Sequence, residues 1–87
     1  MNRIPRNARR GAELLDERLP GWRKRIRPDE LDMADECNCV LGQVLGGYSG
    51  GKKLLGLSER EVELYGFWRH GRQTWDALTA GWRQVAR

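Results

Sequence analysis

The sequence is poor in the residues that bind metals and carry out catalysis. It contains two cysteines, Cys37 and Cys39, and a single histidine, His70. A structural zinc site needs about four such ligands, so these three cannot complete one without a carboxylate or a second subunit. A Cys-x-x-Cys motif and a Walker-type phosphate loop are also absent. We therefore expect no catalytic residue, no cofactor and no metal, and a protein that is not an enzyme.

The chain also lacks an apolar run long enough to span a bilayer, so no membrane association is expected. Its first residues, from Met1 to Arg6, are basic, but no apolar segment follows them, so we expect no signal peptide. A cytoplasmic location with reduced thiols follows from this interpretation. A disulfide between Cys37 and Cys39 would close a very small, strained ring, and we expect Cys39 to pack as a small buried hydrophobic residue.

What the sequence does contain is enough apolar bulk for one domain. Its 87 residues are 39% hydrophobic and 32% charged and include four tryptophans, each able to bury a large area. Strand-like runs are absent. We predict an all-α fold, a single compact domain of four to five short helices with glycine-rich turns. The polar, proline-containing residues 1–7 predict a flexible basic arm, followed by a helical domain over residues 8–87.

In the first half of the chain, apolar spacing predicts the helices. The stripe from Ala8 to Leu19 has alternating steps of four and three residues, as on one face of a helix. A short helix over residues 21–26 should follow Pro20 and end before Pro28. Asp35 is predicted to cap a helix over residues 36–45, in which Gly42 indicates close packing.

In the second half, turn and capping residues predict the elements. Residues 48–51 read as a glycine-rich turn and residues 52–56 as one helical turn. Ser58 and Glu61 match a capping box, and Thr74 can cap the last helix. Together the stripes predict a core of Leu15, Leu19, Trp22, Val40, Leu41, Val44, Leu45, Leu55, Tyr65, Trp75, Leu78 and Trp82.

The net charge of +4 is unevenly distributed. Residues 1–27 carry nine Arg and Lys against three acids, whereas residues 28–40 carry five acids and no base. The acidic segment can be a solvated face, can pair with a basic partner, or can neutralise the basic region within the fold. Basicity alone therefore does not indicate nucleic-acid binding.

One functional hypothesis uses the arginine-rich N-terminal region to bind nucleic acid. Clustered cations can contact several phosphates, and Trp22 could stack on a base if exposed, although it also continues the apolar stripe. The residues of this alternative are Arg3, Arg6, Arg9, Arg10, Arg23, Lys24, Arg25 and Arg27. No helix-turn-helix, zinc-finger or aromatic RNA-binding signature accompanies them.

The other hypothesis uses the segment between Gly66 and Gly71 to bind a protein. Exposed Trp, Tyr and Arg side chains anchor many interfaces, and Phe67, Trp68, Arg69 and Arg72 lie in or beside this segment. Phe67 and Trp68 could equally plug the end of the helical domain. The last helix could also pack on a second copy of itself through Trp75 and Trp82, as a homodimer.

Several short segments of the chain together form a recognisable pattern. They are Gly11-Ala12-Glu13-Leu14-Leu15-Asp16-Glu17, Pro20-Gly21-Trp22, Cys39-Val40-Leu41-Gly42-Gln43, Gly47-Tyr48, Leu55-Gly56-Leu57, Tyr65-Gly66-Phe67 and Leu78-Thr79-x-x-Trp82. In these segments the chain resembles a group of small uncharacterised proteins of mycobacteriophages and related actinobacterial phages and prophages. The resemblance implies an accessory role in the host cytoplasm and carries no catalytic residues. The predicted function is a non-catalytic accessory protein that binds a host or phage protein, with nucleic-acid binding as the alternative.

Overall fold

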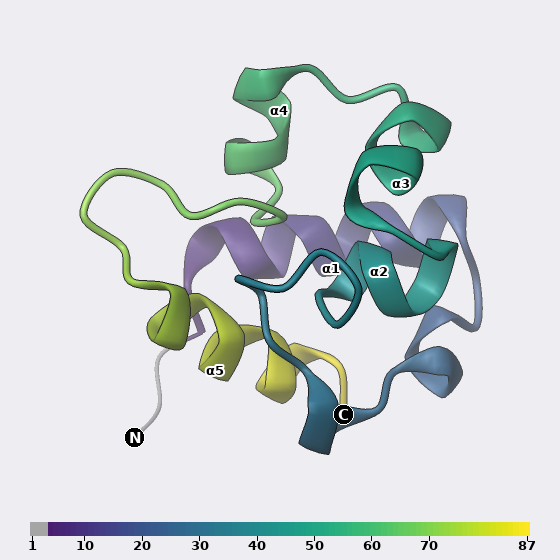
Figure 1. The fold of residues 1–87 in the computed structure, drawn as a ribbon, viewed down its shortest axis with the longest axis horizontal. Coiled ribbons are helices and arrows are strands. Elements are labelled where there is room, and N and C mark those ends of the chain that lie inside the picture. The colour runs from purple at the N-terminus through teal and green to yellow at the C-terminus, as the bar shows by residue number, and fades with distance from the viewer. Residues whose placement is uncertain (1–3) are drawn as a thin grey trace.

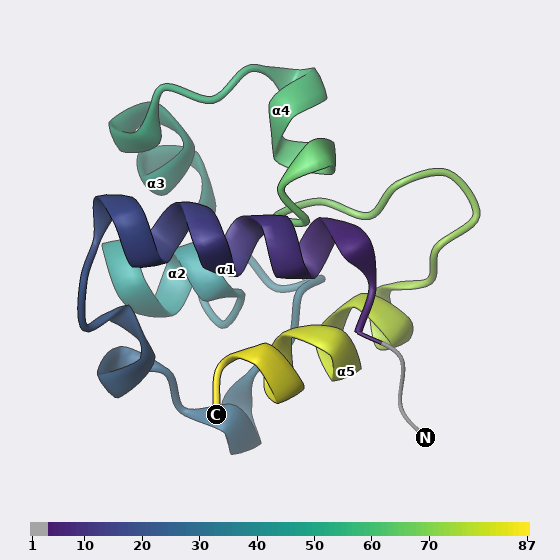
Figure 2. The same cartoon turned by 180° about the vertical axis from the view of Figure 1, so that it is seen from behind.

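Helix α1 (Arg6–Arg18) is the longest helix of the part of the chain that the structure describes. In the computed structural model, which describes residues 4–87, it crosses the width of the molecule (Figure 2). Helices α3 (Tyr48–Leu55) and α4 (Glu59–Leu64) lie on one side of it and α5 (Trp75–Val85) on the other (Figures 1 and 2). Helix α2 (Val40–Leu45) packs against α3.

The predicted fold class is confirmed. Residues 4–87 form five short α-helices in one compact unit and contain no strand. Two 3-10 turns, η1 (Trp22–Arg25) and η2 (Pro28–Glu30), fill the connection between α1 and α2. The predicted helix over residues 21–26 is therefore a shorter 3-10 turn, because Gly21 has a left-handed φ of 87° and Ile26 is already extended.

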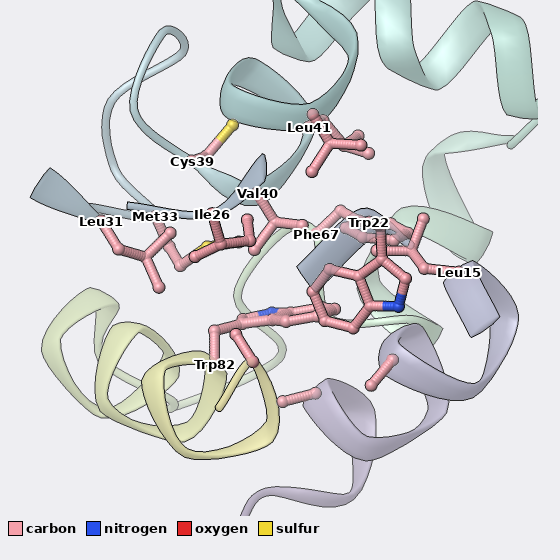
Figure 3. Close-up of a cluster of buried hydrophobic side chains, with 14 of the residues drawn as sticks. Leu15, Trp22, Ile26, Leu31, Met33, Cys39, Val40, Leu41, Phe67 and Trp82 are labelled. Carbon is pink, nitrogen blue, oxygen red and sulfur yellow. The ribbon is translucent and has the colours of Figure 1, made fainter. Parts of the chain in front are cut away.

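The core is built around Trp22 and Trp82 (Figure 3). Their rings meet edge to face with centroids 5.9 Å apart, and both are almost completely buried. Eight of the twelve predicted core residues are buried, whereas Leu19, Leu45, Tyr65 and Trp75 are only half-buried. The core also holds side chains that the stripes did not predict, among them Leu31, Met33, Val62 and Phe67.

The boundary of the predicted flexible arm is corrected. Helix α1 already includes Arg6 and Asn7, and Pro5 lies against Gly81 of α5. Helix α1 therefore begins two residues earlier than the apolar stripe indicated. Residues 1–3 of the predicted arm lie outside the described residues.

The helix predicted over residues 36–45 begins only at Val40. The carboxylate of Asp35 accepts hydrogen bonds from the backbone N–H of Cys37 (2.8 Å) and Asn38 (3.2 Å), which forms a turn instead of a helix cap. Cys39 is the cap, because its Sγ accepts from the N–H of Gly42 at 3.3 Å. A Cβ on Gly42 would lie 2.4 Å from the carbonyl oxygen of Cys37, so the predicted close packing is present.

The turn predicted at residues 48–51 is wrong, because these residues are the first half of α3. Gly51 is buried, and a Cβ added to it would lie 3.0 Å from the Cβ of Leu41. Packing of α3 against α2 therefore outweighs the poor helix propensity of two successive glycines. By contrast, the Ser58–Glu61 capping box and the Thr74 cap are present as predicted.

Candidate functional site

The loop between α4 and α5 is anchored to the core at Gly66. Its φ of +71° suits glycine, and a Cβ there would come within 2.7 Å of the backbone of Asn7 in α1. Its carbonyl oxygen accepts a hydrogen bond of 2.6 Å from the buried indole Nε1 of Trp82. The start of the loop is thus held between α1 and α5, which determines where the next side chains point.

Phe67 points into the core and is not an exposed contact residue. It is 1% exposed, and its ring stacks on Trp82 with centroids 5.5 Å apart and planes 19° from parallel. The prediction of Phe67 as a partner-binding residue is therefore corrected. The backbone turns back on the end of α4 here, since the N–H groups of Phe67 and Trp68 both donate to the carbonyl oxygen of Val62 at 2.9 and 3.2 Å, and this turn directs Phe67 inward.

Trp68 points outward and is held from two sides. It is 42% exposed, and its ring lies edge to face on Trp75 of α5 with centroids 4.9 Å apart. Tyr48 at the start of α3 lies 5.4 Å away on another side. The guanidinium of Arg69 lies 5.9 Å from the ring centre of Trp75. We call the surface formed by Tyr48, Trp68, Arg69, Arg72 and Trp75 the Trp68 surface.

Two arginines complete the Trp68 surface. Arg69 donates from Nη1 to the carbonyl oxygen of Gly71 at 3.1 Å, which fixes its position beside Trp75. Both Arg69 and Arg72 are exposed, and neither has an acidic partner within residues 4–87. Three of the four predicted partner-binding residues therefore face solvent, and Tyr48 and Trp75 join them from other elements.

The same geometry corrects the predicted homodimer contact. Trp82 is completely buried, with an exposed fraction of 0%, so it cannot contact a second copy of the chain. Trp75 is half-buried and engaged with Trp68. The apolar face of the last helix packs within the fold, because α1 covers it. A Cβ added to Gly11 of α1 would lie 2.6 Å from the Trp82 ring.

The predicted nucleic-acid-binding residues separate into two groups, a first group at the start of the chain and on α1 and a second group in and beside η1. In the second group, Arg23 pairs with Asp16 and donates to the carbonyl of Val85 at 3.0 Å. Its guanidinium lies 4.6 Å from the Trp22 ring centre. Arg25 donates to the carbonyl of Val44 at 3.3 Å. These two side chains connect η1 to α5 and α2, so they serve the fold.

Arg27 is also engaged, through an ion pair with Glu30. Among the described residues, this is the one ion pair between residues 1–27 and the acidic residues 28–40. The acidic segment therefore neutralises little of the basic region. Lys24 is exposed. Trp22 is 2% exposed and donates from Nε1 to Asp16 at 2.8 Å, which leaves no ring face for a base.

The carboxylate of Asp16 in α1 connects this helix to Trp22 and Arg23 of η1. Hydrogen bonds from Trp22 and Arg23, together with the charge of Arg23, hold the pKa of the Asp16 carboxyl below its ordinary value of 3.8. The carboxylate is therefore ionised at neutral pH and fixes η1 against α1. The spacing of the sequence, six residues from Asp16 to Trp22, did not indicate this contact.

The first group of arginines is on α1. Arg6, Arg9 and Arg10 are exposed, and none has an ion-pair partner in the part of the chain that the structure describes. Arg3 lies outside the described residues. Arg6 and Arg10, four residues apart, share one side of the helix and line a groove between α1, α4 and the loop.

This groove, which we call the α1–α4 groove, has a volume of about 630 Å³. Its lining residues come from three parts of the sequence and are Pro5, Arg6, Asn7, Arg10, Arg60, Glu63, Leu64, His70 and Gln73. Arg60, Leu64 and Gln73 were not predicted as site residues. They are 50 or more positions from Arg6 and Arg10 in the sequence, so no local pattern could have brought them together.

The cysteines and the histidine do not form a metal site. Cys37 is exposed and Cys39 is 2% exposed, where burial raises the pKa of its thiol above the ordinary 9.0. His70 faces Glu63 instead, with Nδ1 3.3 Å from the carboxylate. Among residues 4–87, no three His, Cys, Asp or Glu side chains lie close enough to hold a metal ion together. No helix within the same residues is long and apolar enough to cross a membrane.

Comparison with models of protein families, with curated proteins and with solved structures found no match to this chain. Two surfaces of this chain are candidates for function, the Trp68 surface and the α1–α4 groove.

Proposed function

We propose that this chain is a small non-catalytic protein that binds a host or phage protein in the host cytoplasm through the Trp68 surface. The observation that carries the proposal is the position of Trp68, 42% exposed and yet packed against both Trp75 and Tyr48. The proposal also includes the origin of this protein in an actinobacterial phage or prophage, which rests on the resemblance described above.

The physical reason concerns the cost of association. An exposed aromatic side chain that is already held in one rotamer loses little conformational entropy when a partner covers it. Tryptophan and arginine are also the residues that most often dominate interface energies. Arg69 lies beside Trp75, and neither Arg69 nor the exposed Arg72 of the same loop has an acidic partner within residues 4–87, so the surface suits a partner with an apolar cavity and carboxylates around it.

The test is recovery of a partner from an actinobacterial lysate treated with nuclease. Tagged protein should retain one host or phage protein in stoichiometric amount, and Trp68→Ala should reduce its recovery about tenfold or more, as expected for an interface anchor. Leu54→Ala is the matched control, since Leu54 is 69% exposed on α3 and outside the Trp68 surface.

Urea unfolding would establish that Trp68→Ala is still folded, since Trp68 is not a core residue. A folded Trp68→Ala protein that retains the same partner as well as the wild type would reject this surface. Absence of any saturable protein partner would reject the function.

The alternative, nucleic-acid binding, retains a smaller set of residues. Arg6, Arg9, Arg10 and Lys24 remain available, whereas Arg23, Arg25 and Arg27 are engaged within the fold. On single-stranded DNA, four phosphate contacts predict a slope of log K against log salt of about −3, instead of the slope of about −6 that eight contacts would give. Binding to single-stranded DNA that is absent or insensitive to salt would reject the alternative.

A further inference from the structure

The α1–α4 groove combines an apolar base with cations that are not paired. Leu64 is 43% exposed in it, and Pro5 is half-buried on the other side. Arg6 and Arg10 approach from α1 and Arg60 from α4. Large exposed apolar side chains of this kind mark binding surfaces when they lie in a concave region rimmed by polar groups.

The charge of the groove is strongly one-sided. Three arginines face a single lining carboxylate, Glu63, and that carboxylate is already in contact with His70. None of the three arginines has an acidic partner or a side-chain hydrogen bond within residues 4–87. Arginines that lie together without compensating acids attract an anionic ligand and bind carboxylates in a bidentate manner.

The wall of the groove is fixed before any ligand binds. Asn7 and Gln73 exchange side-chain hydrogen bonds of 2.9 and 3.2 Å, and the backbone N–H of His70 donates to Gln73 at 3.1 Å. These contacts hold the loop against the first turn of α1. The shape of the groove is therefore a property of the folded chain and does not require a partner.

We propose that the α1–α4 groove docks an acidic peptide segment of a partner protein, with one apolar side chain on Leu64 and its carboxylates on Arg6, Arg10 and Arg60. Charge complementarity identifies the occupant as acidic, and the exposed leucine distinguishes it from a bare anion. Among the lining residues, no tryptophan, tyrosine or phenylalanine offers a stacking platform, so the groove is less suited to single-stranded nucleic acid.

This inference rests on the proposed protein-binding function and adds the chemistry of the partner. It also assigns Arg60, Leu64 and Gln73 a role that the Trp68 surface does not give them. The groove and the Trp68 surface flank the same loop, since His70 and Gln73 line the groove while Trp68 and Arg69 belong to the other surface.

The experiment is a selection from a displayed library of random peptides on the immobilised full chain. Selected peptides are expected to carry at least two Asp or Glu residues around an aliphatic or aromatic residue. A fluorescein-labelled peptide from this set is then titrated with wild type, Arg6→Glu, Arg60→Glu and Arg9→Glu. The dissociation constant should rise about 10- to 100-fold for Arg6→Glu and Arg60→Glu, the effect of losing a charge-assisted contact.

Arg9→Glu is the matched control, because Arg9 is exposed on the same helix but does not line the groove. It should change the dissociation constant by no more than about threefold, the expected effect of a rim charge. Folding is not at risk, since a glutamate in the first turn of α1 or α4 is favourable to the helix dipole. Arg6→Gln and Arg60→Gln provide a second, milder pair.

Several outcomes would overturn the inference. They are selected peptides without acidic residues, equal losses for Arg9→Glu and the groove variants, or a 15-residue single-stranded DNA that binds more tightly than any selected peptide. Peptides that need Trp68 but not Arg6 or Arg60 would also overturn it while leaving the proposed function intact. Failure of the lysate experiment together with failure of the selection would reject both.

Discussion

Asn7 and Gln73, 66 positions apart in the sequence, form a reciprocal pair of side-chain amides. The Nδ2 of Asn7 donates to Oε1 of Gln73 at 2.9 Å, and the Nε2 of Gln73 donates to Oδ1 of Asn7 at 3.2 Å. Asn7 Oδ1 also accepts from the N–H of Ala8. The pair connects the first turn of α1 to the loop before α5, next to both candidate binding surfaces.

We predict that this pair is energetically coupled. Asn7→Ala and Gln73→Ala should each lower the free energy of unfolding by about 1 kcal/mol, because each leaves a half-buried amide without its partner. The double variant should lose about 0.5–1 kcal/mol less than the sum, as for residues in one hydrogen-bond network. Urea unfolding of the four proteins measures the coupling. Asn7→Ala combined with Gln43→Ala should be additive, because the side chain of Gln43 hydrogen-bonds to the backbone of Arg27 and Asn38 instead.

The contact between Gly11 and Trp82 predicts a severe effect of one added methyl group. In Gly11→Ala, the Cβ would lie 2.0 Å from the carbonyl oxygen of Tyr65 and 2.6 Å from the Trp82 ring. We expect a loss of about 3 kcal/mol or more in the free energy of unfolding, since the backbone must move.

Gly50→Ala is the matched control for Gly11→Ala. Gly50 is exposed in α3 and nothing lies within 4 Å of its added Cβ. This variant should be more stable than the wild type by about 0.5–1 kcal/mol, because alanine restricts the unfolded chain and favours the helix. Thermal unfolding that ranks the two variants in the opposite order would contradict the packing of α1.

Asp16 predicts an acid-dependent loss of stability. Its pKa is lowered in the folded state by the hydrogen bonds from Trp22 and Arg23, so its ionisation stabilises the fold above pH 3.8. That stability is lost as the pH falls through the lower, folded pKa. Asp16→Asn should therefore cost about 0.5–1 kcal/mol at pH 7, and the difference from wild type should shrink below pH 3.8.

Chemical denaturation at pH 7 and pH 3 would measure this difference. Glu17→Gln is the control, because Glu17 is exposed on the same helix and has no ion pair within residues 4–87. A cost of Asp16→Asn that stays constant with pH would show that the charge of Asp16 is not what stabilises η1.

The two cysteines should differ in reactivity. The exposed thiol of Cys37 should react quickly with a disulfide reagent in the native protein, and Cys37→Ser should abolish the fast phase. Cys39 should react only on unfolding. Equal rates for both thiols would contradict the role of Cys39 as a buried helix cap.

The raised pKa of Cys39 adds a prediction at alkaline pH. Because the folded state favours the protonated thiol, its contribution to stability is complete below the ordinary pKa of 9.0 and falls as the pH rises towards the folded value. The free energy of unfolding should therefore decrease more steeply above pH 9 in the wild type than in Cys39→Ala. Parallel curves would contradict the prediction.

By itself, the sequence determined the features that depend on neighbouring residues. The helical class followed from the spacing of apolar residues, and the caps at Ser58 and Thr74 followed from hydrogen bonds that span three residues. Burial of Trp22 and Cys39 followed from their places beside apolar residues. These signals are local, so they can be read without knowing how the helices pack.

Only the tertiary structure decided which of these residues meet. Phe67 and Trp68 are adjacent and chemically alike, yet Gly66, held between α1 and Trp82, directs one inward and the other outward. The same packing of α1 on α4 placed Arg60 beside Arg6 and Arg10, while Arg23 was turned to Asp16. Contacts between residues 50 or more positions apart depend on backbone approach at glycines such as Gly11, which leaves no periodic signal in the chain.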